Sequence, residues 1–244
     1  MESLNARSKQ IRRDVIKLSS ANGGYHYGGS FSATEILITL YDKVLEPRDK
    51  FILSKGHACW PLYVLLMEKG LRPKLGGHPT LDEKNGIHFT TGSEGHGMPA
   101  AIGMALARKI QRKPGRIFVL IGDGEAQEGT TWESLLTAPH HNLDNLLVIV
   151  DCNKFQGSGA IKDILPISGL KQIANILNWR AEEIDGHNTD EIQKALQPLN
   201  DLTPRLVIAN TIKGRGVSFM EGKAGWHSRF LSPDEQKQAL KELE

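Results

Sequence analysis

Three short runs of consecutive apolar residues constrain the fold of this chain more than any other feature. They are RIFVLI at 116–121, NLLVIV at 145–150 and RLVIANT at 205–211, and each contains β-branched side chains. Such runs are typical of strands that are covered on both faces in a parallel sheet. Helical stretches lie between them, and KFILS at 50–54 predicts a further strand. The alternation predicts an α/β fold with a doubly wound, mostly parallel sheet flanked by helices.

The composition indicates a globular chain without an extreme electrostatic character. Of the 244 residues 39% are apolar and 24% are charged, and no repeat or linker divides the chain, so residues 1–244 are expected to form a single domain. The net charge of +2 creates no global field that would attract nucleic acid or a membrane. We therefore expect neither as a partner, and any bound anion must be held by local groups.

Cysteine usage and the N-terminal segment bear on the cellular compartment. Cys59 and Cys152 lie far apart and have no spacing typical of a metal site or a disulfide framework. The first twenty residues lack an apolar signal core, and no apolar run approaches the length of a membrane span. These features lead us to expect a cytoplasmic protein.

Side-chain spacing predicts an amphipathic helix at the beginning of the chain. One face of this helix carries Leu4, Ile11, Val15 and Leu18. The helix is expected to end before Asn-Gly-Gly at 22–24. Ser32 and Glu35 have the spacing of a capping box, which predicts that a second helix begins there.

Two further signals concern helices later in the chain. Ser232 and Glu235 have capping-box spacing, and Pro233 occupies the first helical position of a closing helix. Pro139 is expected to end or kink a helix that starts near Thr130, because proline lacks the N–H group that a helix interior requires.

Oxygen-bearing side chains follow two of the predicted strands. Asp123 comes directly after the strand at 116–121 and its flanking glycine, and Asn153 follows the strand at 145–150. Ligands of parallel sheets bind beyond the carboxyl ends of the strands. A carboxylate, an amide oxygen and a nearby backbone carbonyl form an oxygen-only site that suits Mg²⁺ or Ca²⁺, with water and phosphate oxygens as further ligands.

The glycines on either side of Asp123 point to a bound phosphate. Gly122 and Gly124 permit a sharp turn and a close approach of the backbone, and the N–H groups of the following helix would complete an anion site. Gly-Asp-Gly alone is also an ordinary turn sequence. The position of Asn153, thirty residues after Asp123 and at the end of a second buried strand, favours the functional interpretation.

Gly-Asp-Gly followed at this distance by Asn resembles the signature of thiamine-diphosphate enzymes. The wider sequence resembles the transketolase family in several segments, which follow the family's order from His26 to His227. These segments are HYGGSFSATEIL, DKFILSKGHACWPLY, GGHP, TTGSEGHGMPAAIGMALA, GDGEAQEGTTWE, DCNKFQ, DGHN and TIKGRGVSFMEGKAGWH. Together they are far more specific than any one of them. The resemblance implies the thiamine-diphosphate-binding fold, in particular its diphosphate-binding domain.

The resemblance implies a metal and cofactor site. Mg²⁺, for which Ca²⁺ or Mn²⁺ can substitute, would be held by Asp123, Asn153 and the carbonyl of Phe155. The cofactor is thiamine diphosphate, and it would be contacted by the residues of the metal loop, by a distant lysine and by the backbone of one further loop. These residues are Gly122, Asp123, Gly124, Glu125, Asn153 and Lys213, with Gly92, Ser93 and Glu94 touching the aminopyrimidine ring.

Four histidines match positions of the family's active centre. The resemblance implies that His57 approaches the diphosphate and that His78 polarises the reacting carbonyl of the sugar or relays a proton. His26 and His227 would line the substrate channel, with His227 also close to the cofactor. Taken singly, a histidine beside glycines is more often a turn or surface residue. For Lys213, the alternative to a contact with the diphosphate is an ordinary solvated lysine.

One loop departs from the family's pattern, which leaves the donor sugar open. Glu94 stands where an apolar residue, commonly Leu, is expected, and His96 stands where Gln is frequent.

Glu128 falls where the family has an acidic group at a dimer interface, although a solvated glutamate at a helix start is the alternative.

The family's carbanion-forming glutamate lies on a second domain, so the resemblance implies a partner. We expect a separate C-terminal transketolase subunit that carries the pyrimidine-binding domain, in an α2β2 heterotetramer acting on sugars or sugar phosphates. A truncated chain is the alternative; Met1 and the capped closing helix favour a natural split.

Other functions remain open at this point. A deoxyxylulose-phosphate synthase or a 2-oxo-acid dehydrogenase subunit would use a 2-oxo acid donor, but the HYGGS, GGHP and KGRG segments favour sugar chemistry. A non-catalytic regulatory subunit would have no need of the four histidines and Asp123. A zinc hydrolase is disfavoured because the chain has no HExxH segment.

Overall fold

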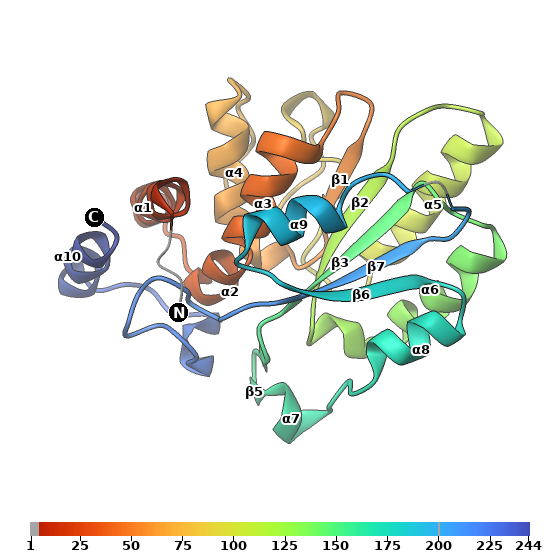
Figure 1. The fold of residues 1–244 in the computed structure, drawn as a ribbon. Helices are drawn as coiled ribbons and strands as arrows, with labels where there is room; N and C mark the ends of the chain where they lie inside the picture. The colour runs from red at the N-terminus through yellow and green to blue at the C-terminus, as the bar shows by residue number, and fades with distance from the viewer. Residues whose placement is uncertain (1–4, 200) are drawn as a thin grey trace.

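The predicted strands form one parallel sheet at the centre of the molecule (Figure 1). The computed structural model describes residues 5–199 and 201–244. In this part of the chain the main sheet has five strands, in the order β1-β2-β3-β7-β6, and each pair is parallel. The strands are β1 (Lys50–Leu53), β2 (Ile117–Gly122), β3 (Leu146–Cys152), β7 (Arg205–Asn210) and β6 (Arg180–Asp185). A small antiparallel hairpin follows β3 and consists of β4 (Phe155–Gln156) and β5 (Gly159–Ala160).

Helices connect the strands. The described α-helices are α1 (Ala6–Ala21), α2 (Tyr27–Ser32), α3 (Thr34–Thr39), α4 (Cys59–Glu68), α5 (Gly97–Ile110), α6 (Gly129–His140), α7 (Ile161–Ile164), α8 (Leu170–Ile176), α9 (Thr189–Ala195) and α10 (Pro233–Glu242). A π-helical turn (Leu40–Val44) follows α3, and short 3₁₀ turns cover Gly56–Ala58, Glu83–Asn85, Glu125–Gln127 and Ala224–His227. None of the helices in the described residues is both long and apolar enough to cross a membrane.

Alternate residues of the strands face two separate hydrophobic cores. In β3, Leu147 and Ile149 belong to the core beneath α1, α3, α4 and α9, whereas Val148 and Val150 belong to the core beneath α5, α6 and α8 (Figure 1). Because both faces of the sheet are covered, β2, β3 and β7 consist of nearly continuous apolar runs. The predicted α/β, doubly wound sheet is thereby confirmed.

Strand β6 has no apolar run, so its sequence does not predict a strand. Its sequence is RAEEID, in which Ala181 is buried in a core while Arg180 and Glu183 are exposed. The strand pairs with β7 and forms the edge of the sheet. Charged side chains on an edge strand discourage pairing with other chains, and here they also hide the strand's signal.

The opening helix lies where its periodicity predicts. Helix α1 buries Ile11 and Val15, Leu18 packs partly buried against the same core, and Asn5 caps the first turn by accepting from the Ser8 N–H group at 2.8 Å. Leu4, which belongs to the predicted face, lies outside the described residues.

The predicted capping box at Ser32 and Glu35 is wrong. Ser32 is the last residue of α2, and its hydroxyl donates to the Asp151 carboxylate at 2.6 Å. Helix α3 begins at Thr34 without a side-chain cap, and Glu35 is buried beside Arg12. Both side chains therefore make long-range contacts, which their sequence spacing cannot reveal.

The other local predictions are confirmed. Ser232 and Glu235 form a reciprocal capping box at the start of α10. Pro139 lies in the last turn of α6, which ends at the next residue. Because proline has no N–H group, the carbonyl of Leu135 is free for another donor. It accepts from the Trp179 indole at 2.8 Å, which ties α6 to the start of β6.

Truncation in the central strand should destabilise the fold far more than truncation at its edge. Ile149 is 1% exposed, and we expect Ile149→Ala to lower the free energy of unfolding by about 3 kcal/mol through lost burial and a cavity. Glu183→Ala in exposed β6 is the control and should change it by less than about 0.5 kcal/mol. Urea titration measures both, and equal losses would contradict this account of the core.

Candidate functional site

The carboxyl ends of β2 and β3 bring the predicted oxygen ligands to one edge of the sheet. Asp123 is 2% exposed, and its carboxylate accepts from the backbone N–H groups of Gly124, at 2.9 Å, and of Lys154. Lys154 has a φ of 71°, a left-handed conformation that turns the chain between Asn153 and Phe155. The loop after β3 therefore wraps around the Asp123 side chain.

The oxygen atoms at this edge suit a divalent cation. Asn153 is buried, and its side-chain oxygen accepts from the Phe155 N–H group at 3.1 Å. Burial, and then the nearby Asp151 charge, raise the pKa of Asp123 to about 6, an effect that a bound cation would oppose. Within residues 5–199 and 201–244 no three Asp, Glu, His or Cys side chains gather as a metal-binding group. A cation here would need amide, carbonyl, phosphate and water oxygens beside Asp123, which is typical of Mg²⁺.

Two buried lysines, Lys55 and Lys213, border this edge, and the sequence motifs point to Lys213 alone. Lys55 is 1% exposed and forms an ion pair with fully buried Asp151, which also accepts from the hydroxyls of Ser32 and Thr211. Neither Lys55 nor Asp151 is among the predicted residues, although each lies two positions before one of them, His57 in SKGH or Asn153 in DCN. A charged residue inside such a motif is the sequence signal that could have identified Lys55 and Asp151 as part of the site.

Lys213 carries a buried amine, and the described residues offer it no ion pair. It is 1% exposed, and a Cβ atom on Gly28 would lie only 3.0 Å from its Cε atom. Burial, and then the nearby Lys55 charge, lower the pKa of Lys213 to about 8. The nearby Asp123, Asp151 and Glu94 charges offset this lowering only in part, so the environment fits an anionic ligand such as a diphosphate.

All four predicted histidines lie in one cluster beside the lysines. Ring centroids are 5.5 Å apart for His26 and His57, 5.9 Å for His26 and His78, and 4.8 Å for His57 and His227. His26 adopts a left-handed backbone conformation with a φ of 67°, and its Nδ1 contacts the carbonyl oxygen of His227. Segments from both ends of the chain thus meet here.

Burial keeps three of these histidines uncharged at neutral pH. The pKa of His57 lies well below its ordinary value, that of His227 falls to about 3, and that of His26 is also lowered. Desolvation is the largest cause in each case, and neighbouring cationic groups add to it. The Nδ1 atom of His227 is buried without a partner in the described chain. The cluster therefore offers neutral imidazoles that can donate or accept hydrogen bonds.

A glycine-rich loop closes another side of the cluster. Gly92 has a φ of 146°, and a Cβ atom there would lie 3.3 Å from the His78 ring. Glu94 places a carboxylate oxygen 3.3 Å from Nδ1 of His57, so its side chain faces the cluster. Ser93 is exposed beside it. The loop's backbone and the Glu94 carboxylate are thus both available to a ligand.

The Glu125 side chain has a structural role that its predicted contact with the cofactor did not include. Its side chain is buried, and the carboxylate accepts from the Gly95 N–H group at 2.9 Å, the Gly122 N–H group at 3.2 Å and the Ser54 hydroxyl. Burial, the largest cause, raises its pKa to about 7. Glu125 therefore ties the glycine-rich loop to the end of β2.

The helix that follows Gly-Asp-Gly begins close to its expected start near Thr130. A 3₁₀ turn (Glu125–Gln127) intervenes, and α6 begins at Gly129. Gly124 is required to be small, because a Cβ atom there would lie 2.8 Å from the Cβ atom of Gln156 in the hairpin. Glu128 is exposed just before α6, and its side chain makes no cap hydrogen bond.

Comparison with known proteins gives a family for this arrangement. The family model described as "Transketolase, thiamine diphosphate binding domain" matches residues 7–243. The chain is 37% identical to a subunit of the apulose-4-phosphate transketolase of Actinobacillus succinogenes, and the match covers 99% of this chain and 96% of that protein. It is 36% identical to the 6-deoxy-6-sulfo-D-fructose transketolase subunit SqwG of a Clostridium species, again over 99% and 96% of the two chains.

Longer relatives match over part of their length. Human transketolase is 32% identical over the whole of this chain, which spans 42% of the human protein. The solved structure of Campylobacter jejuni transketolase superposes with a TM-score of 0.85 at 27% identity, covering 98% of this chain and 42% of that one.

Removing the unpaired charge of Lys213 should stabilise the ligand-free chain. Its folded pKa of about 8 lies below the unfolded value, so burying the charged amine costs stability at neutral pH, and stability should rise as the pH increases from about 8 to 10.5. We expect Lys213→Met to raise the unfolding free energy at pH 7 by about 2–3 kcal/mol and to flatten that rise.

Exposed Lys223→Met is the matched control and should leave both quantities unchanged. Denaturant titrations at pH 7, 8.5 and 10 measure the effect. A less stable Lys213→Met chain at pH 7 would show that the nearby carboxylates outweigh the cost of burying the amine.

Proposed function

The chain belongs to the transketolase family, and we propose that it is the thiamine-diphosphate-binding subunit of a two-chain transketolase. In this proposal the subunit, with residues 1–244 as one diphosphate-binding domain, helps to transfer a two-carbon ketol unit from a ketose or ketose phosphate to an aldose or aldose phosphate. The observation that carries it is the meeting, at one sheet edge, of buried oxygen ligands, an unpaired buried lysine and uncharged histidines. This set suits an anionic cofactor and a polyhydroxy substrate.

The chain's own residues would hold the cofactor and its metal ion. Mg²⁺, or Ca²⁺ or Mn²⁺ in its place, would bind Asp123, Asn153 and the carbonyl of Phe155. Lys213 would supply the counter-charge of the diphosphate, and Gly122 and Gly124 would allow its close approach. When bound, thiamine diphosphate supplies a carbanion that attacks the ketose carbonyl and carries the two-carbon fragment.

The histidine cluster would orient the sugar and manage its protons. Burial keeps His26, His57 and His227 uncharged, so they can donate a hydrogen bond to a carbonyl or accept one from a hydroxyl. His78 would face the reacting carbonyl. The backbone of Gly92, Ser93 and Glu94 would contact the aminopyrimidine ring.

We propose that the partner is a separate C-terminal transketolase subunit. Support comes from two relatives that are named as subunits and that this chain matches over 96% of their length. The partner would contribute the pyrimidine-binding domain and its glutamate, and an α2β2 heterotetramer would place each site at a subunit interface. We place this assembly in the cytoplasm, in the metabolism of pentose phosphates or related sugars, with neither nucleic acid nor a membrane as a partner.

Glu94 weighs against a 2-oxo acid as donor. Its carboxylate lies 3.3 Å from His57 and faces the cluster in which the donor would react. A 2-oxo acid carries its own carboxylate next to the reacting carbonyl, so the two negative charges would repel each other. A ketose has a neutral hydroxymethyl group at that place, and Glu94 can accept a hydrogen bond from it.

Ketol transfer is tested with the chain copurified with the product of the neighbouring reading frame. Thiamine diphosphate, Mg²⁺, xylulose 5-phosphate as donor and ribose 5-phosphate as acceptor are supplied, and sedoheptulose 7-phosphate is measured. We expect the product only when both chains are present. Turnover of pyruvate but not of ketoses would overturn the proposal in favour of a 2-oxo acid enzyme.

Asp123→Ala should abolish divalent-dependent cofactor binding by the two-chain complex, because it removes the carboxylate at the metal site. Isothermal titration with thiamine diphosphate and Mg²⁺ should show a loss of affinity of at least about a hundredfold. Asp163→Ala, at an exposed position in α7, is the control and should bind normally. Full activity of the Asp123→Ala complex would indicate a non-catalytic regulatory subunit.

A further inference from the structure

The DGHN motif at 185–188 joins β6 to α9, and the proposed function gives it no part. The Asp185 carboxylate accepts from the His187 backbone N–H group at 2.8 Å, which closes the turn. Gly186 must be glycine for packing, because a Cβ atom there would collide with the methyl group of Thr211. The turn is therefore pressed against the segment that leaves β7.

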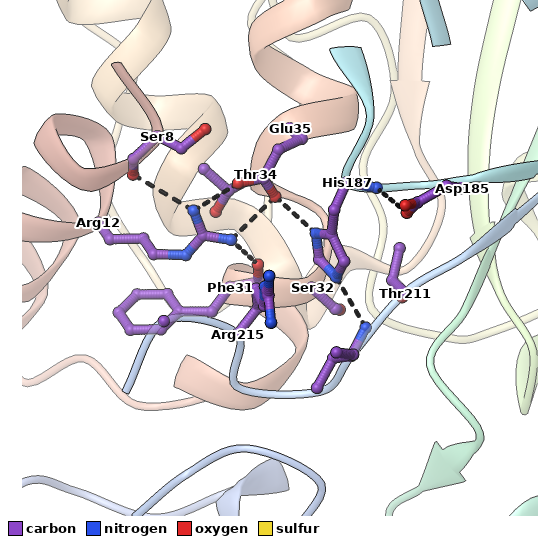
Figure 2. A network of polar contacts seen from close by, with 12 residues as sticks. Ser8, Arg12, Phe31, Ser32, Thr34, Glu35, Asp185, His187, Thr211 and Arg215 are labelled. Carbon is purple, nitrogen blue, oxygen red and sulfur yellow. Dashed lines mark hydrogen bonds and ion pairs between the residues drawn. The ribbon is translucent and has the colours of Figure 1, made fainter. Parts of the chain in front are cut away.

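The His187 ring joins this segment to α3. Its Nε2 atom accepts from the backbone N–H group of Ile212 at 2.8 Å (Figure 2). Because a backbone N–H group can only donate, the ring proton lies on Nδ1, which is 2.9 Å from a carboxylate oxygen of Glu35. The imidazole thus donates to Glu35 on one side and holds a main-chain amide on the other.

Glu35 is itself fixed by a buried ion pair. Arg12 is fully buried, and its two terminal nitrogens lie 2.6 and 2.9 Å from the two oxygens of Glu35 (Figure 2). One of these nitrogens also donates to the carbonyl of Phe31 at 2.7 Å. Burial alone would raise the pKa of Glu35, but the Arg12 charge and the His187 hydrogen bond outweigh it and lower that pKa. Glu35 is therefore a fixed carboxylate, and His187 has a rigid support.

The segment held by His187 leads directly into the proposed anion site. Thr211 donates to Asp151, and the Lys213 side chain lies beside Gly28, where a Cβ atom would be only 3.0 Å from its Cγ and Cε atoms. Gly214 then donates to the carbonyl of Gly28 at 2.9 Å. The Ile212 amide lies between these contacts, one residue before Lys213.

The outer side of this segment borders a cavity. The cavity has a volume of about 810 Å³, and its lining includes His187, Thr211, Ile212 and Arg215. Side chains therefore do not press the segment inward at this place. A buried lysine amine without an ion pair is drawn towards water, so the contacts that hold this segment also help to keep Lys213 buried.

We propose that His187 is a positioning residue of the anion site, and that its hydrogen bond with the Ile212 amide keeps Lys213 inside. This positioning role is argued from contacts within this chain alone. Its expected consequence, tighter binding of the cofactor's diphosphate, rests on the proposed function. The Arg12–Glu35 ion pair holds the ring in place through the hydrogen bond between Glu35 and Nδ1 of His187.

Two substitutions separate the two hydrogen bonds of the ring. His187→Asn keeps a donor near the Nδ1 position for Glu35 but leaves the Ile212 amide without an acceptor. His187→Gln is longer, and its amide oxygen can occupy the Nε2 position and accept from Ile212. His140→Asn, at the exposed end of α6, is a matched control.

The readout is competitive acetylation of lysine amines on the complete chain, followed by mass spectrometry. Exposed Lys237 is the internal reference, and Lys55, buried and paired with Asp151, reports general loosening. In His187→Asn, labelling of Lys213 relative to Lys237 should rise about tenfold, the factor expected when one buried hydrogen bond is lost. His187→Gln and His140→Asn should stay within about twofold of the unmodified chain, and Lys55 should not respond.

Three results would overturn the proposal: an unchanged Lys213 in His187→Asn, an equal rise in His187→Gln, or a parallel rise of Lys55. A separate titration of the two-chain complex with thiamine diphosphate and Mg²⁺ tests the consequence. If His187→Asn exposes Lys213 without weakening cofactor binding, the positioning role stands and the proposed function fails in its assignment of Lys213.

Discussion

The burial of charge at the carboxyl end of β3 is the constraint on which the rest of the site depends. Asp151 is fully buried, and it can remain ionised only because Lys55 and the hydroxyls of Ser32 and Thr211 surround it. These partners come from α2, from the turn after β1 and from the segment after β7. Satisfying one carboxylate therefore fixes the relative positions of three distant segments, and the lysines and histidines around it inherit that geometry.

The central strands could be predicted from sequence because their physical cause is local. A strand that is covered on both faces must be apolar at consecutive positions, and β2, β3 and β7 show this in the letters alone. Strand β6 could not be found in this way, because Ala181 is its only buried residue and charged residues fill most of its other positions. The capping box at Ser32 failed for a related reason: its two polar residues satisfy partners more than a hundred and more than twenty positions away.

The candidate site was predictable as a set of motifs but not as a network. Resemblance identified the residues that gather at the sheet edge, including all four clustered histidines. It did not reveal that Lys55 and Asp151 form an ion pair, or that the Glu125 side chain holds the glycine-rich loop. Such pairings depend on which segments the fold brings together, and a single sequence contains no record of that. The residues that contact a ligand are thus easier to predict from sequence than the residues that hold them in place.

The strand order has a consequence for synthesis on the ribosome. Strand β7 lies between β3 and β6, although it is made after both. Until residues 205–210 emerge, β3 has an unpaired hydrogen-bonding edge and β6 lacks its partner. The nascent chain must therefore keep a gap in its sheet open and then insert the late strand. During that interval the apolar edge of β3 is vulnerable to pairing with another chain, which makes this strand the place where a chaperone would be needed most.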